Sequence, residues 1–304
     1  MAVVGDAMLD VYLRGDVERI SPEAPVPVVR VRERTHALGG AANVAHNVAA
    51  LGARCELVAA LGRDAAADAV RALLGTLGTE SRALITVTRP TTTKTRIVAR
   101  AQQLVRVDEE DDGDITGPEV AAVLSAVGRA VADADAVILE DYNKGVLVAP
   151  VIDAAMEAAG RRAVPVIVDP KYRNFFRYRG ATIFKPNRRE LEAALGASVD
   201  LDSPHALHET LDRLGVAHLL LTLGEHGMAL VGSDGTTERV PTTARAVYDV
   251  VGAGDTVTAY LAVMLAAGAT PLEAAIVANY AAGVEVGKSG AATVSAAEVL
   301  AAHA

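Results

Sequence analysis

Short apolar runs alternate with Ala-rich segments of helical periodicity along most of this chain. The runs are apolar at consecutive positions, which is typical of strands that are buried on both faces of a parallel sheet. They predict strands at residues 2–5, 56–61, 136–139, 164–168, 181–184 and 219–222. The segments between them predict helices near residues 43–51, 64–77, 118–131, 150–159, 188–195 and 204–214. This alternation indicates a doubly wound α/β fold with helices on both faces of a mostly parallel sheet.

Two segments interrupt this rhythm because apolar and polar residues alternate within them. Such alternation suits an antiparallel sheet with one exposed face. We expect residues of about 11–36 and 89–109 to form one small discontinuous β-sheet, a lid over the active-site edge of a single domain that spans 1–304. The acidic run at residues 108–114 lacks the spacing of a metal-binding loop, and we expect it to be a solvated return loop.

The segment Tyr-Asp-Val-Val-Gly-Ala-Gly-Asp near the C-terminus combines a flexible turn with a carboxylate. A strand pattern ends near residues 250–251, so Gly252, Ala253 and Gly254 are expected to form a strand-to-helix turn before an apolar helix. The free N–H groups and the dipole at such a helix start favour an anion. Asp255 would repel that anion, so it suits a base that takes a proton from a nucleophile. An ordinary helix-capping aspartate fits this stretch equally well.

Composition narrows the class of protein. The chain has 304 residues, of which 51% are hydrophobic, and Trp is absent, so the core must consist mainly of Ala, Val and Leu. The single cysteine, Cys55, excludes a disulfide framework and fits a reducing cytoplasm. The net charge of −9 argues against broad nucleic-acid binding. A signal peptide is not expected, because no basic segment precedes a long apolar stretch at the N-terminus. A membrane span is not expected either, because Pro271, Glu273 and Glu285 interrupt the apolar C-terminal stretches.

Several polar residues lie where strands give way to helices. Gly39 and Gly40 precede a helix and would let a ligand approach the backbone, and Asn43 could bind hydroxyl groups, although such turns are common. Asp10 lies beyond the first strand, where α/β sheets bind ligands, although a cap or turn role is the more usual one. Asn187 and Glu190 could hold water around Mg²⁺ or could simply form a capping box.

Two common nucleotide motifs are absent from the sequence. It contains no GxxxxGK[ST] motif, and Val257 stands where a dinucleotide-binding fingerprint needs its third glycine. These absences disfavour a P-loop protein and a dehydrogenase. A glycine-rich turn after the strand at residues 219–222 could instead lie beside a nucleotide.

These segments, in this order, resemble the ribokinase-like (PfkB) sugar kinases over essentially the whole chain. The resemblance rests on Asp249-Val-Val-Gly-Ala-Gly-Asp255-Thr and on Gly39-Gly40 with Asn43, although Val250 replaces a common Thr. It implies a ribokinase-like fold, the cofactors ATP and Mg²⁺, and phosphoryl transfer to a sugar hydroxyl. It also implies roles for individual residues. Asp255 would be the general base, and the amides of Gly252, Ala253 and Gly254 would surround the phosphoryl group. The sugar would be bound by Asp10, Gly39, Gly40 and Asn43, the nucleotide by Lys185, Asn187, Thr222, Gly224 and Gly227, and hydrated Mg²⁺ by Asn187 and Glu190.

A narrower resemblance, to the heptose-7-phosphate kinases, is carried by five segments: residues 19–27, 38–45, 141–145, 168–171 and 287–290. It implies phosphorylation of the C1 hydroxyl of D-glycero-β-D-manno-heptose 7-phosphate, on the route to ADP-heptose. Some of these kinases carry an adenylyltransferase domain with an H-x-G-H motif, which this sequence lacks, so it resembles the kinase half only.

The remote phosphate of such a substrate needs local cations, because the chain as a whole is acidic. The candidates are Arg100, Arg106, Lys144 and Lys171. The resemblance further suggests a homodimer formed through the lid. Alternative functions are a kinase for another sugar or sugar phosphate, such as fructose 6-phosphate, ribose or a nucleoside, and a non-catalytic sugar or nucleotide sensor.

Overall fold

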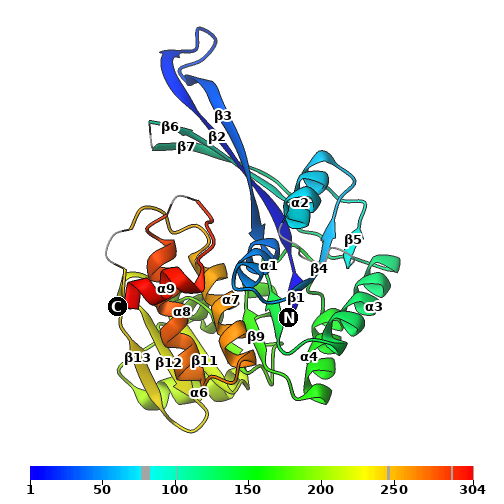
Figure 1. The fold of residues 1–304 in the computed structure, drawn as a ribbon, viewed down its shortest axis with the longest axis vertical. Helices are drawn as coiled ribbons and strands as arrows, with labels where there is room; N and C mark the ends of the chain where they lie inside the picture. Colours follow the sequence, from blue (N-terminus) through cyan, green and yellow to red (C-terminus); the bar gives the residue numbers. More distant parts are fainter. Residues whose placement is uncertain (77–82, 101, 245–246, 289, 304) are drawn as a thin grey trace.

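A computed structural model describes residues 1–76, 83–100, 102–244, 247–288 and 290–303 (Figure 1). In this described part, the main sheet has nine strands in the order β13-β12-β11-β10-β9-β8-β1-β4-β5. Its strands are parallel except where β12 pairs with β11 and with β13. The bounds are β1 Ala2–Gly5, β4 Glu56–Leu61, β5 Leu84–Thr86, β8 Val137–Glu140, β9 Val166–Asp169, β10 Ile183–Phe184, β11 His218–Thr222, β12 Met228–Gly232 and β13 Thr237–Val240.

All six strands expected from the apolar runs are present, each within two residues of its expected bounds. The prediction of a mostly parallel sheet is therefore confirmed. The strands β5, β12 and β13 were not expected. β5 has only three residues, and the edge strand β13 is largely exposed, so neither gives the long apolar run of a central strand. β12 lies between β11 and β13 and consists of five buried residues, so its strand signal was present in the sequence.

Helices cover both faces of the main sheet, as the alternation predicted. Alternate residues of β1 point to opposite faces: Val4 packs against α3–α6, and Val3 packs against the other helices. The bounds are α1 Ala41–Ala50, α2 Ala65–Thr76, α3 Pro118–Ala132, α4 Ala149–Arg162, α5 Arg188–Leu195, α6 Pro204–Leu214, α7 Ala253–Ala266, α8 Pro271–Glu285 and α9 Ala296–His303. The expected end of the second helix, Leu77, lies outside the described residues.

The lid predicted from the two alternating segments is present as a second sheet that projects from the main body (Figure 1). Its strand order is β3-β2-β6-β7, with β2 Ala7–Ile20, β3 Pro27–Gly40, β6 Thr93–Ala99 and β7 Gln102–Glu109. One expectation was wrong, because β2 and β6 pair in parallel rather than antiparallel. Both strands start at the main body and run outward, so they share a direction, while β3 and β7 return.

The strand expected to end near residues 250–251 is absent from the described residues around it. The backbone N–H groups of Tyr248 and Asp249 donate instead to Val286 O, at 2.6 and 3.1 Å. The side chain of Val250 is exposed, so this apolar stretch is not a buried strand but an irregular segment against the end of α8. Gly252 precedes α7 as predicted, but Ala253 and Gly254, which were expected in the turn, are the first two residues of the helix.

Among the described residues, no helix combines the length and apolar character needed to cross a lipid bilayer.

Candidate active site

Acidic residues gather at the carboxyl edge of the main sheet, where three neighbouring parallel strands end. β1 is followed directly by Asp6, β8 ends at Glu140 and β9 ends at Asp169. The register places Gly5 beside Glu140 and Glu140 beside Asp169, so the three strands end at one level. α7 begins at the same edge, since a Cβ on Gly254 would lie 3.8 Å from Asp169 Oδ2. The first turn of α7 therefore meets the acidic edge of the sheet.

Asp255, in the first turn of α7, is buried and held from two sides. Asn43 Nδ2 donates to Asp255 Oδ2 at 2.7 Å, and the Tyr142 hydroxyl donates to Oδ1 at 2.9 Å. Burial raises the pKa of Asp255 to about 6, although these two hydrogen bonds act to lower it. The carboxyl group is thus fixed in orientation and can exchange a proton near neutral pH.

Gly252 is the N-cap of α7 and has a φ of 96°, which favours glycine. A Cβ at this position would lie 3.2 Å from Asn43 Nδ2. A larger residue would therefore strain the backbone and crowd the amide that holds Asp255. The first N–H groups of α7 have no partner within the helix and make its start suitable for an anion.

A buried cluster of charges lies beside this turn. The carboxylate oxygens of Glu140, Asp169 and Asp255 lie within 4.8 Å of one another. Lys185 Nζ donates to Asp169 Oδ2 at 2.7 Å. Neither oxygen of Glu140 has a hydrogen-bond partner among the described residues. Burial, followed by the charges of Asp169 and Asp255, raises the pKa of Glu140 well above its ordinary value. Three convergent carboxylates with an unpartnered member fit a divalent cation.

The residues expected around the sugar lie where β2 and β3 meet the start of α1. Asp10 is buried on β2, where Arg96 Nη1 donates to its Oδ1 at 2.5 Å. A Cβ on Gly39 would lie 3.0 Å from Asp10 Oδ2, so glycine leaves space in front of this carboxylate. Gly40 has a φ of 55° and turns the chain from β3 into α1, which brings Asn43 to Asp255. The structure therefore groups residues that were predicted separately.

An apolar pocket of about 530 Å³ adjoins the glycine turn. It is lined by four of the residues expected around the nucleotide, by Gly254, and by apolar side chains: Asn187, Thr222, Gly224, Gly227, Val250, Val257, Ala282 and Val286. Lys185 is not part of this lining and instead pairs with Asp169. The pocket opens beside the start of α7, so a molecule within it could present a charged group to the turn.

Asn187 and Glu190 form the capping box that the sequence left open as an alternative. Asn187 Oδ1 accepts from the Glu190 N–H, and Glu190 Oε2 accepts from the Asn187 N–H, both at 2.9 Å. Lys171 also pairs with Glu190. A second role in holding water around a cation stays a prediction.

The cations expected at the remote phosphate lie mostly in ion pairs. Arg106 pairs with Asp108, Lys144 pairs with Glu110, and Lys171 pairs with Glu190. Arg100 is exposed in the turn between β6 and β7. We call residues 108–114 the acidic loop. Its first two residues, Asp108 and Glu109, end β7, so the expected return loop begins only at Glu110. The segment is exposed, as expected, but several of its carboxylates are ion-paired, which its sequence alone did not reveal.

Sequence reasoning gave no role to five residues of this region: Asp6, Arg96, Glu140, Tyr142 and Asp169. Asp6, Glu140 and Asp169 each stand at the end of a buried strand, which is a usable signal in an α/β sheet. Arg96 and Tyr142 had no comparable local signal, because each acquires its role through a contact with a distant carboxylate.

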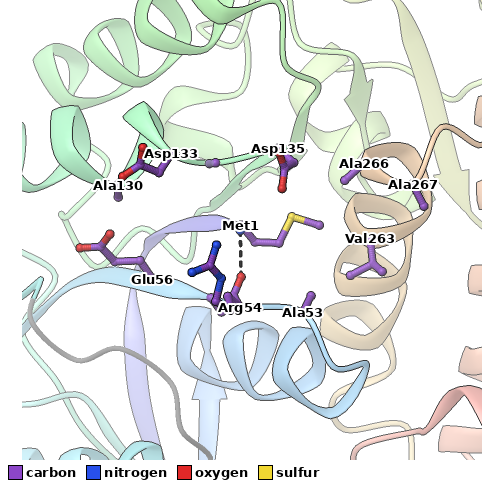
Figure 2. A pocket seen from close by; sticks show the side chains of 12 residues that line it. Met1, Ala53, Arg54, Glu56, Ala130, Asp133, Asp135, Val263, Ala266 and Ala267 are labelled. Carbon is purple, nitrogen blue, oxygen red and sulfur yellow. Dashed lines mark hydrogen bonds between the residues drawn. The ribbon is translucent and has the colours of Figure 1, made fainter.

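A second cavity, of about 580 Å³, lies at the opposite edge of the main sheet (Figure 2). It is lined by charged residues at the amino ends of β1 and β4 and at the end of α3, including Arg54, Glu56, Asp133 and Asp135. Figure 2 shows the hydrogen bond of 2.9 Å from the Met1 amino group to Arg54 O at one wall. None of the predicted site residues lines this cavity.

Residues 1–298 match a family model described as pfkB family carbohydrate kinase. The chain belongs to this family. It is 47% identical over 303 residues to the bifunctional protein HldE of Rhodospirillum rubrum, a match that covers 98% of this chain and 61% of the relative. The chain thus spans about three fifths of the length of that relative.

Solved structures of the family share the fold. The ribokinase of Arabidopsis thaliana complexed with ribose and ATP has a TM-score of 0.77 at 24% identity, covering 99% of this chain and 97% of that chain. The phosphofructokinase-2 of Escherichia coli in complex with potassium has a TM-score of 0.81 at 18% identity, covering 100% and 97%. The predicted family and the predicted ribokinase-like fold are both confirmed.

Proposed function

We propose that this chain is an ATP-dependent sugar kinase. Its acceptor would be the C1 hydroxyl of D-glycero-β-D-manno-heptose 7-phosphate, and its product the 1,7-bisphosphate used in ADP-heptose synthesis. The observation that carries the proposal is the Asp255 carboxylate, held by Asn43 and Tyr142 directly behind a glycine turn that suits an anion. A pure phosphate-binding loop has no use for a carboxylate at this point.

Asp255 is the general base of the proposed reaction. Its pKa of about 6 keeps it mainly ionised at neutral pH, so it can accept the proton of the attacking hydroxyl. The N–H groups of Gly252, Ala253 and Gly254 would stabilise the charge that develops on the transferring phosphoryl group. Base and anion site must be neighbours, because the nucleophile and the phosphoryl group react in line.

Asp10 and Asn43 orient the sugar in this proposal. Asp10 is fixed by Arg96 through one of its oxygens, and its other oxygen lies against the space left by Gly39. Gly40 lets the chain turn so closely that Asn43 can bond both Asp255 and a nearby hydroxyl. The backbone on this side therefore approaches the sugar without side chains in the way.

The apolar pocket lined by Thr222, Gly224 and Gly227 would take the adenine of ATP, because a flat apolar base needs such surroundings. Glu140 and Asp169 would hold Mg²⁺, directly or through water, with Asn187 and Glu190 contributing through water from the edge. When bound, Mg²⁺ would neutralise charge on the phosphates. Lys185 lies near Gly254, where it would add positive charge to the same region.

The choice of heptose 7-phosphate rests on the five segments that resemble heptose-7-phosphate kinases and on the identity to a bifunctional HldE. One of these segments includes Ser289, which lies outside the described residues. A single kinase domain, a homodimer through the lid and a cytoplasmic location belong to the same proposal. Exposed apolar side chains on the lid, such as Val31, Val105 and Val107, are consistent with a protein contact there.

The test is release of ADP from Mg-ATP with a panel of acceptors: both anomers of heptose 7-phosphate, fructose 6-phosphate, ribose and adenosine. We expect turnover of the β-heptose 7-phosphate alone. Turnover of another acceptor would discard the substrate but keep Asp255 as base. Binding of ATP without turnover of any acceptor would favour a non-catalytic sensor and contradict the proposal.

A further inference from the structure

Two lysines at the base of the lid share one carboxylate of the acidic loop. Lys94 Nζ lies 3.0 Å from Glu110 Oε2, and Lys144 Nζ lies 2.9 Å from Glu110 Oε1. Lys94 also contacts Asp108 at 3.2 Å, and Lys144 contacts Asp112 at 2.6 Å. The two ammonium groups thus converge on Glu110, and their side chains are only 15% and 13% exposed. A largely buried pair of cations around one anion is the arrangement of an anion-binding site.

This pair lies beside the proposed sugar site. Lys94 stands on β6 directly opposite Asp10 on β2 in the lid register. Lys144 follows two residues after Tyr142, whose hydroxyl holds Asp255. The backbone N–H groups of Tyr142 and Lys144 both donate to one Asp6 oxygen at 2.9 Å, which fixes the loop that carries them. One lysine therefore comes from the sugar-binding side of the lid and the other from the loop that positions the base.

We propose that Lys94 and Lys144 form the subsite for the remote phosphate of the sugar substrate, and that the Glu110 carboxylate occupies this subsite until the phosphate displaces it. The proposal rests on the proposed function, which requires a phosphorylated sugar. A phosphate group brings up to two negative charges and three acceptor oxygens to the two lysines, whereas Glu110 brings one charge and two oxygens.

Glu110 is suited to displacement in a way that the other paired carboxylates are not. The only ion-pair partners of its side chain among the described residues are Lys94 and Lys144. In contrast, Glu190 caps α5 while it pairs with Lys171, so freeing that lysine would also disturb a helix start. Although partial burial acts to raise it, the pKa of Glu110 lies below its ordinary value because the two lysines donate hydrogen bonds.

Displacement would also make the subsite selective. A sugar without a phosphate cannot replace the charge of Glu110, so the lysines stay paired with the acidic loop and add nothing to its binding. A phosphorylated sugar gains the two lysines and releases a single carboxylate to solvent. Glu110 therefore raises the threshold for phosphate binding without touching the reacting hydroxyl.

The first experiment measures binding of inorganic phosphate to the full chain by titration calorimetry, without nucleotide. Glu110→Gln should bind phosphate about tenfold more tightly than wild type, because a competing charged partner is removed while the lysines remain. Lys94→Gln and Lys144→Gln should each weaken binding by about tenfold. Glu109→Gln is the matched control, since Glu109 is an exposed neighbour on β7 with no ion pair among the described residues.

Unchanged or weaker phosphate binding by Glu110→Gln, or equal changes in Glu110→Gln and Glu109→Gln, would overturn the displacement. Glu110→Ala, which also removes the competing charge, should shift in the same direction as Glu110→Gln, and a thermal melt of both variants verifies the fold.

Steady-state kinetics separates this proposal from the proposed function. In Glu110→Gln, KM for heptose 7-phosphate should fall while KM for ATP and kcat stay near wild type. Turnover of heptose 7-phosphate with no change in KM would reject the subsite and leave the function standing. Tighter phosphate binding by Glu110→Gln without turnover of any sugar phosphate would reject the function and leave an anion site at the two lysines.

Discussion

Replacing Asp255 by Asn should make the protein more stable and at the same time almost inactive. The carboxylate is fully buried, and its pKa is about 6 in the folded protein against an ordinary value of 3.8. One pKa unit corresponds to about 1.4 kcal/mol, so ionising Asp255 in the folded chain is unfavourable by about 3 kcal/mol at neutral and alkaline pH. The Asn43 and Tyr142 hydrogen bonds already reduce this penalty.

The sign of the pH dependence follows from the raised pKa. Between pH values of about 4 and 6 the folded state binds more protons than the unfolded state, so the free energy of unfolding falls as pH rises through this window. The side-chain amide introduced by Asp255→Asn cannot ionise, so the variant escapes this loss. At about pH 8 the free energy of unfolding of the variant should exceed that of wild type by about 1–3 kcal/mol, the lower values allowing for reorientation of the Tyr142 hydroxyl.

Urea denaturation at two pH values is the assay. The advantage of Asp255→Asn should shrink by about 2 kcal/mol from about pH 8 to about pH 4.5. Asp68→Asn is the control, because it removes the same charge from the first turn of α2, where the side chain is 85% exposed. It should lose a few tenths of a kcal/mol or less. Meanwhile kcat of Asp255→Asn should fall by about 10²–10⁴, the range for a positioned base.

Two results would refute this reasoning. A variant less stable than wild type at alkaline pH would mean that the charged carboxylate contributes favourably to the fold. A stability difference that does not change with pH would mean that Asp255 does not titrate in the folded protein as its burial implies. Near-normal kcat would separately reject its role as base.

Three further changes probe the site. Tyr142→Phe removes a hydrogen bond that lowers the pKa of Asp255. In the pH profile of kcat/KM, the fall on the acidic side should therefore shift to a pH above about 6, and an unchanged profile would contradict this role of Tyr142. Gly40→Ala places a Cβ 2.4 Å from a backbone oxygen, whereas Gly52→Ala meets nothing within 4 Å, and both residues have positive φ. In urea denaturation Gly40→Ala should therefore lose about 2 kcal/mol more than Gly52→Ala, and equal losses would count against the close approach. Ala282→Phe should fill the apolar pocket and raise KM for ATP by about tenfold with KM for the sugar unchanged. A parallel rise in both KM values would contradict the proposal that the nucleotide binds in this pocket.

The central strands and most helices could be predicted because their signals are local. A run of apolar residues such as β4 has no stable place except in a sheet covered on both faces. The irregular segment before α7 shows the limit of this reasoning. Val250 and Val251 look like the end of a strand, but the neighbouring backbone bonds to α8 rather than to the sheet. The parallel pairing of β2 with β6 was equally invisible, since it depends on where both strands leave the main body.

The candidate base and its glycine turn were visible for the same local reason. Gly252, Gly254 and Asp255 lie next to one another in the chain, so their chemistry can be judged from order alone. The partners of Asp255 could not be found in this way. Asn43 is 212 residues away and Tyr142 is 113 residues away, and neither contact has a sequence spacing that marks it.

Charge pairing between residues far apart in the chain was decided by the tertiary structure alone. The sequence determined which residues carry charge, that the chain is acidic, and that Lys144 lies near the end of a strand. Only the folded lid brings Lys94 and Lys144 to the same carboxylate and joins Arg96 to Asp10 across 86 residues. Electrostatic interaction depends on distance and burial, and for residues on separate strands and loops both are set by the packing of the whole domain.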